Sequence, residues 1–98
     1  MTGKKRFSPK RPLSKRQIGN VPDDLPAVYE LLNRKGENIY TGLAKRSRVR
    51  DRIDEHLPGG QDSVPGASGF RIKQMPSVEL ARKEEKRIIK QDKPKYNE

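Results

Sequence analysis

The chain has 98 residues, of which 23 are Lys or Arg and 13 are Asp or Glu, so its net charge is +10. Only 30% of the residues are hydrophobic, which predicts one small domain with a limited core. The absence of cysteine excludes disulfide frameworks and thiolate zinc sites, and the single histidine leaves oxygen ligands for any metal. No apolar run approaches the ~20 residues of a membrane span, and no hydrophobic stretch follows the basic N-terminus. We therefore expect a cytoplasmic protein without a membrane partner.

Residues 1–20 carry seven basic residues and no acid. Pro and Gly interrupt this segment and no hydrophobic period runs through it, so we expect a disordered basic arm before a folded domain at 21–98. The first basic run, Lys4, Lys5 and Arg6, favours contact with a polyanion, because each neutralised phosphate releases condensed counterions. A solubilising tail is the alternative interpretation.

A β-hairpin is predicted in the segment PAVYELLNRKGENIYTGL, with Gly36 in its turn. A two-residue turn would place Tyr29 opposite Gly42 and would put Tyr40 on the same sheet face as Tyr29. A three-residue loop would place the two tyrosines on opposite faces, and the sequence leaves this choice open. The two predicted strands are 27–32 and 39–43.

The segment SRVRDRIDEHL predicts a helix with Ser47 as its N-cap, and its apolar residues recur at helical spacing. At ~100° per residue, Arg52 and His56 lie on the same flank of this helix, four residues apart, so that their side chains can meet. Arg50 falls on the other flank. The alternation of Arg48, Arg50 and Arg52 is typical of a solvated basic face or of contacts to a DNA backbone.

A third strand and a second helix complete the predicted domain. The segment FRIKQM alternates apolar and polar residues, and a helix is expected to begin at Pro76-Ser77 and to run to about Gln91. The order strand, strand, helix, strand, helix predicts an α+β fold with a small, mainly antiparallel three-stranded sheet flanked by helices.

One residue conflicts with the apolar pattern of the second helix. Glu85 is four residues after Ala81 and four before Ile89, within the stripe that should face inward. A carboxylate in such a stripe costs free energy unless it is paired, hydrogen-bonded or bound to a metal. An ion pair with an arginine and a metal-ligand role are both compatible with this position.

In their order and spacing, these segments resemble the GIY-YIG nucleases. The two strand motifs of that family correspond to residues 27–29 (AVY) and 40–42 (YTG), with ten residues between the tyrosines. The terminal KPKYN resembles the family's Lys/Arg-Pro-x-Tyr-Asn segment, and Asn97 follows Glu85 by twelve residues. The tail is also similar to that of the nuclease domain at the front of the excision-repair incision subunit. The similarity covers about residues 26–97.

The resemblance implies a DNA endonuclease that depends on one divalent ion, Mg²⁺ or Mn²⁺. It implies a metal ligand in Glu85, a phosphate-binding group in Arg52, and a general base in Tyr29, which would need cationic neighbours to lower its pKa from ~10. The other implied site residues are Tyr40 and His56, which would polarise or orient Tyr29, and Asn97, which would tie the terminal segment to the active-site loop by hydrogen bonds.

The spacing leaves two candidates for the catalytic arginine. Counting from Tyr40 selects Arg50, whereas counting from His56 selects Arg52, which we prefer because it shares a helix flank with His56. Leu43 stands where many relatives have Lys, so one phosphate contact is either missing or supplied by Lys45. The expected DNA-binding residues are Lys4, Lys5, Arg6, Lys45, Arg46, Arg48 and Arg50.

Two other functions fit the same sequence. One is a nucleic-acid-binding module that uses the basic arm and a degenerate nuclease scaffold, and the other is a basic structural protein such as a ribosomal component. The tyrosines would then be packing residues and His56 a surface or structural residue. For the nuclease, the arm and the 58–69 loop are too short to read a long sequence. A branched or damaged DNA, or a protein partner that supplies specificity, is therefore expected.

Overall fold

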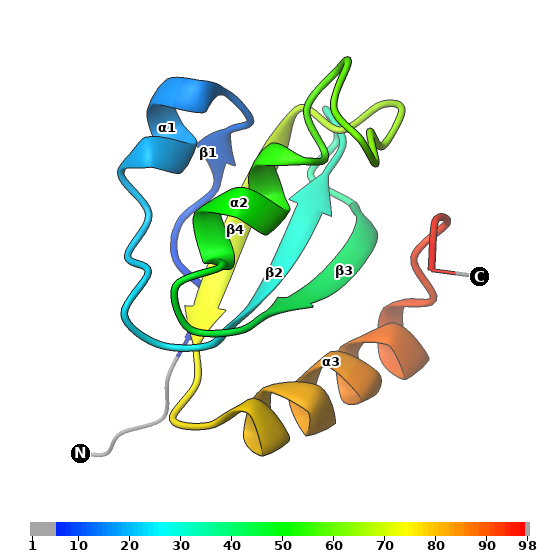
Figure 1. Cartoon of the computed structure of the whole chain (residues 1–98). Helices are drawn as coiled ribbons and strands as arrows, with labels where there is room; N and C mark the ends of the chain where they lie inside the picture. The colour runs from blue at the N-terminus through cyan, green and yellow to red at the C-terminus, as the bar shows by residue number, and fades with distance from the viewer. Residues whose placement is uncertain (1–5, 98) are drawn as a thin grey trace.

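The computed structural model describes residues 6–97 and shows an α+β domain with a four-stranded antiparallel sheet and three helices (Figure 1). The strands lie in the order β1-β4-β2-β3. Among the described residues, no helix is long and apolar enough to cross a membrane. The elements are β1 (Arg11–Pro12), α1 (Lys15–Gly19), β2 (Ala27–Leu32), β3 (Asn38–Ala44), α2 (Val49–Asp54), β4 (Gly69–Gln74) and α3 (Val78–Asp92).

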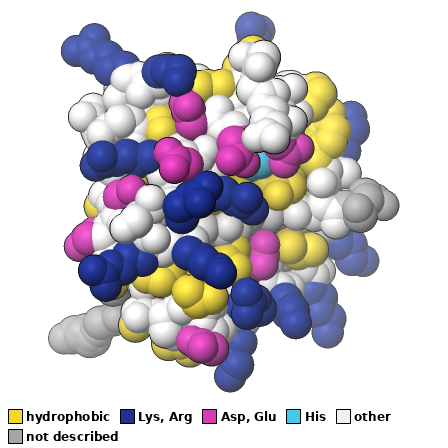
Figure 2. Space-filling view, in the orientation of Figure 1, with side chains coloured by type: hydrophobic (Ala, Val, Ile, Leu, Met, Phe, Trp, Pro, Cys, Tyr) yellow, Lys and Arg dark blue, Asp and Glu magenta, His cyan; other side chains and the backbone are white. Residues whose placement is uncertain are grey.

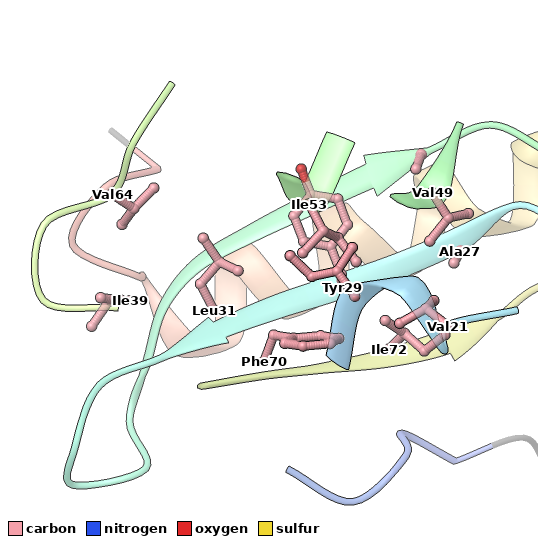
Figure 3. Packing of buried hydrophobic residues seen from close by; sticks show 12 residues of the cluster. Val21, Ala27, Tyr29, Leu31, Ile39, Val49, Ile53, Val64, Phe70 and Ile72 are labelled. Atoms are coloured by element: carbon pink, nitrogen blue, oxygen red, sulfur yellow. The ribbon is translucent and has the colours of Figure 1, made fainter. Parts of the chain in front are cut away.

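The main core lies between the sheet and the pair α1 and α2. Strand alternation turns Tyr29 and Leu31 of β2 and Phe70 of β4 toward this side, where they pack with Ile18 of α1 and Ile53 of α2 (Figure 3). All six residues of β2 are buried, because this central strand is covered on both faces.

Helix α3 covers the opposite face, where its Ala81 and Ile88 pack against Val28. This helix begins where the sequence predicts, and the Ser77 side chain accepts a hydrogen bond from the Leu80 amide. From β2 onward the elements follow the expected order of strand, strand, helix, strand and helix.

The ion pair considered for Glu85 is instead made by its neighbour Glu84. The Glu84 carboxylate lies 2.8 Å from Arg87 and 2.7 Å from Lys73 of β4. The hydrogen bonds from Arg87 and Lys73 lower the pKa of Glu84 to about 2, although partial burial opposes this change. Glu84 thus anchors α3 to the sheet electrostatically.

The expectation of a disordered arm is wrong for its described part, 6–20. Here α1 inserts Ile18 into the core with 2% of its surface exposed, and the Ser8 amide donates to the Ile72 carbonyl at 2.7 Å. The segment forms β1 against β4, so the sheet has four strands rather than three. A few apolar residues suffice to dock a basic segment when a sheet edge also satisfies its backbone. Lys4 and Lys5 lie outside the described residues.

The hairpin register places both tyrosines on one face, as expected for a two-residue turn, although the actual loop, 33–37, is longer. Tyr29 pairs with Gly42 and Leu31 with Tyr40, and the register then shifts by one residue at Leu32. This β-bulge absorbs the extra residue, so the longer loop does not rotate the tyrosines apart.

Ser47 is not the N-cap of α2, contrary to the prediction. Its φ angle is 69°, and the hydrogen-bond acceptor for the first turn comes from a distant residue, Asp23. The Asp23 Oδ1 atom accepts from the amides of Val49 at 2.7 Å and Arg50 at 3.4 Å. A carboxylate supplied from a distant loop cannot be identified from the local sequence.

Asp23→Ala is expected to lower the free energy of unfolding by about 1 kcal/mol, because the first-turn amides of α2 lose their side-chain acceptor. Urea denaturation followed by circular dichroism measures this change. Asp24→Ala is the matched control, since that carboxylate makes only an exposed hydrogen bond to Gln74. Equal losses in the two variants would contradict the capping role.

Candidate active site

Three residues singled out from the sequence, Tyr29, Tyr40 and His56, lie together, and we call them the Tyr–His cluster. The Tyr29 hydroxyl is 2.7 Å from Nε2 of His56, and the ring centroids of Tyr40 and His56 are 4.9 Å apart. Tyr29 and His56 are almost fully buried, with 1% and 3% of their surfaces exposed, whereas Tyr40 is half-buried. The cluster therefore runs from the core outward, with Tyr40 as its more accessible member.

The hydrogen bonds of His56 fix the direction of proton donation. Its Nδ1 atom lies 2.8 Å from the carbonyl oxygen of Asp62, which can only accept, so Nδ1 carries the proton. In the neutral imidazole Nε2 is then the acceptor, and the Tyr29 hydroxyl donates to it. The Asp62 carboxylate lies 3.8 Å from the same Nδ1 atom. Tyr29 is thus aligned to pass its proton to His56.

His56 reaches this position from a turn rather than from a helix. Helix α2 ends at Asp54, so the predicted pairing of Arg52 and His56 along one helix flank is wrong. The turn after the helix buries His56 beneath the 58–68 loop, whose Val64 amide donates to the His56 carbonyl.

The pKa of Tyr29 is raised, not lowered as expected from cationic neighbours. Burial is the main cause and the nearby Tyr40 adds to it, while the positive charge of Arg52 opposes the rise without overcoming it. Burial likewise raises the pKa of Tyr40. A phenolate at Tyr29 is therefore not populated at neutral pH, and any basic role requires His56 to take the proton.

The glycine of the YTG motif is required by the packing of Tyr29. A Cβ atom at Gly42 would clash with the ring and hydroxyl of Tyr29, which lies across this position from the paired strand. The close approach of an aromatic ring explains glycine in the middle of a buried strand.

The geometry separates the two candidate arginines. The Arg50 side chain donates through Nε to the carbonyl of Val21 at 2.7 Å, so it ties α2 to the segment after α1. Arg52 instead borders a cavity of about 320 Å³, and its charge acts on both tyrosines of the cluster. This placement favours Arg52. The other residues that line the cavity are Leu43, Lys45, Arg48 and Arg82.

Glu85 is half-buried on α3 and makes no salt bridge within residues 6–97. Burial raises its pKa, although the charges of Arg82 and Lys86 oppose the rise. Its charge also raises the pKa of Tyr40. Among the described residues, no three His, Cys, Asp or Glu side chains are grouped to hold a metal. A single carboxylate still suits Mg²⁺, which commonly takes its remaining ligands from water and substrate phosphate.

Asn97 bonds the terminal segment to Thr41 of the strand β3, and not to a loop. Its Oδ1 atom accepts from the Thr41 amide at 2.7 Å, and its Nδ2 donates to the Thr41 carbonyl at 2.9 Å. The Tyr96 amide also donates to the Ile39 carbonyl. Because the Asn97 amide contacts backbone on both sides, it is a positioning residue beside Tyr40.

Two residues near the site, Arg82 and Asp62, were not predicted from the sequence. Arg82 is three residues before Glu85 and therefore on the same side of α3, a signal that helical spacing contains. Asp62 acts through a backbone carbonyl in an irregular loop, for which the sequence has no signal. Of the other expected DNA contacts, Arg46 is exposed but outside the cavity lining, and Arg6 borders a different cavity beside β4.

No protein-family model matches the chain, and no curated protein matches it significantly. The assignment of a function therefore rests on the residues of the site and their geometry.

Gly42→Ala is expected to displace the Tyr29 ring and break its hydrogen bond to His56, with a loss of about 1–3 kcal/mol from overpacking. The imidazole NMR signals of His56 report the hydrogen bond, and urea denaturation reports the stability. Gly19→Ala is the control, because a Cβ there meets no atom within 4 Å. Unchanged His56 signals in Gly42→Ala would show that the ring does not depend on this glycine.

Proposed function

We propose that the chain is a metal-dependent endonuclease of the GIY-YIG type that hydrolyses DNA phosphodiester bonds. The observation that carries the proposal is the buried hydrogen bond from Tyr29 to His56, beside the charged groups Arg52 and Glu85. These residues come from β2, α2, α3 and the loop after α2, and they are the positions that the family resemblance selects. The order of elements after residue 26 also agrees with the ββαβα arrangement.

The donor set fits one hard divalent cation, Mg²⁺ or Mn²⁺, held by Glu85. The carboxylate is half-buried and makes no salt bridge within residues 6–97, and burial raises its pKa despite the charges of Arg82 and Lys86. A bound cation would compensate that charge. When bound, the ion would stabilise negative charge on the phosphate oxygens and on the leaving oxygen.

We propose that the protein's own residues carry out a relay of two simultaneous proton transfers. The Tyr29 oxygen takes a proton from the attacking water while the Tyr29 hydroxyl proton passes to Nε2 of His56. The water oxygen forms the new bond to phosphorus, and the leaving oxygen departs with the electron pair of its broken bond and takes a proton from solvent. The carbonyl and carboxylate of Asp62 stabilise the resulting imidazolium from its Nδ1 side. This relay needs no preformed phenolate, in agreement with the raised pKa of Tyr29.

Arg52 is proposed to bind the scissile phosphate. Its guanidinium is half-exposed, and the Glu55 carboxylate is its only close acid at 3.9 Å within the described structure, so the group can turn to a phosphate. Its planar fork matches two phosphate oxygens, and its charge favours the more negative transition state.

Nucleic-acid binding without cleavage is the competing function, because the cavity cations would support either. Glu85→Gln separates the two, since it removes the proposed ion-binding charge and leaves the cations in place. We expect nicking of supercoiled plasmid in Mg²⁺, none in EDTA, and a loss of at least about 100-fold in the variant. A panel of branched DNAs tests the substrate structure.

Glu79→Gln is the matched control for this experiment, because Glu79 is an exposed carboxylate in the first turn of the same helix. Its activity should equal that of the wild type. If neither the wild type nor the variants cleave any of these DNAs but all bind them equally, the binding module replaces the nuclease.

Tyr29→Phe and His56→Ala are each expected to lower the cleavage rate by about 10²–10⁴-fold, because each removes one member of the relay. The double variant should be little slower than either single variant, since the two residues act as a unit. DNA affinity in EDTA and thermal unfolding show that binding and folding persist. Losses that multiply in the double variant would refute the relay.

A further inference from the structure

The outer edge of β3 is only partly occupied by the terminal segment. Both backbone groups of Thr41 bond to the Asn97 side chain, so in the ladder with β2 they point away from the sheet. Antiparallel pairing repeats every two residues, so the N–H and C=O of Leu43 also point outward. The backbone bonds from the terminal segment to β3 go to Ile39 and Thr41. Leu43 lies farther along the edge.

Leu43 also lines a cavity whose charged lining residues are all positive. Lys45, Arg48, Arg52 and Arg82 line it with Leu43, and none of its lining residues is acidic. On the face of the molecule seen in Figure 2, Lys and Arg side chains lie across the middle and over α3, with apolar atoms between them.

The cations are only weakly compensated by nearby acids. Arg48 lies 3.5 Å from Asp51 in an exposed pair, and pairs of this kind contribute little. Within residues 6–97, no salt bridge involves Lys45 or Arg82. Their charges therefore remain available to a ligand.

We propose that this cavity binds the phosphodiester adjacent to the scissile one on a nucleic-acid strand. Lys45, Arg48 and Arg82 neutralise that phosphate, and the Leu43 N–H donates to one of its oxygens. The inference rests on the proposed function, because Arg52 both borders the cavity and lies beside the Tyr–His cluster. A strand whose scissile phosphate sits at Arg52 brings a neighbouring phosphate into the cavity.

The shape of the free edge favours a compact anion over an added peptide strand. A peptide that extends the sheet needs several outward backbone groups along the strand, but the Ile39 carbonyl and both groups of Thr41 are already bonded to residues 96–97. One outward N–H on a residue that lines the cationic cavity instead suits a phosphate oxygen. Such a contact sets the position of the strand without reading its bases.

The test measures binding to a labelled duplex of about 20 base pairs in EDTA. Fluorescence anisotropy gives the affinity at each of several salt concentrations. Arg48→Gln/Arg82→Gln should reduce the slope of log affinity against log salt by about 2, one for each lost phosphate contact. Arg34→Gln/Lys35→Gln removes the same charge from exposed positions outside this cavity and outside the basic arm, and should leave the slope nearly unchanged. Equal reductions in both variants would overturn the proposal, because net charge alone would then explain the effect.

Amide NMR locates the contact independently of cleavage. Titration with the dinucleotide pdTdT should shift the Leu43 amide in the wild type and not in Arg48→Gln/Arg82→Gln, whose remaining spectrum verifies folding. A Leu43 signal that moves with a tetraglutamate peptide but not with pdTdT would overturn the proposal in favour of an acidic protein partner. If the wild type nicks plasmid but Leu43 stays unmoved by pdTdT, only the subsite is refuted. If Leu43 moves but no DNA is cut, the nuclease is refuted and a phosphate site remains.

Discussion

The hydrogen bond between Tyr29 and His56 is the constraint on which the rest of the site depends. Both groups are nearly fully buried, and a buried polar group left without a partner costs about 1–3 kcal/mol. His56 meets this requirement on one side through Tyr29 of β2 and on the other through the carbonyl of Asp62. The bond therefore fixes the irregular loop after α2 to the central strand. The open space at Gly42 allows the Tyr29 ring to reach it.

Glu84 and Glu85 are adjacent on α3 but have different surroundings. Glu84 faces the sheet, where Arg87 and Lys73 compensate it and lower its pKa to about 2. Glu85 is rotated by ~100° from Glu84 around the helix, and burial raises the pKa of Glu85. Neighbouring carboxylates with opposite shifts mark a division of roles. Glu84 holds α3 against the sheet, whereas Glu85 makes no salt bridge within residues 6–97.

The sequence predicted the elements that depend on interactions between residues close together in the chain. An apolar-rich run and its return after the Gly36 turn placed β2 and β3, and residue alternation placed β4. Ser77 marked the start of α3 because its side chain caps the adjacent turn. The errors concern interactions between distant segments. Burial of Ile18 orders the described part of the basic arm, residues 6–20, and Asp23 caps α2 from 26 residues away. The site residues were selected by the family resemblance and not by residue spacing alone. Spacing alone could not show that Tyr29 is too buried to ionise readily.

The location of the site at β3 follows from the layered structure. Tyr29, His56 and Arg52 lie on the side of the sheet that faces α1 and α2, whereas Glu85 and Arg82 belong to α3 on the other side. A sheet separates the groups on its two faces, so these residues can act on one phosphate only around an edge. Residues 8–13 bond along the other edge, at β4 and the loop that precedes it. The terminal segment covers β3 up to Thr41. The edge at Leu43 is where both layers meet solvent, and a ligand placed there reaches the charges of both.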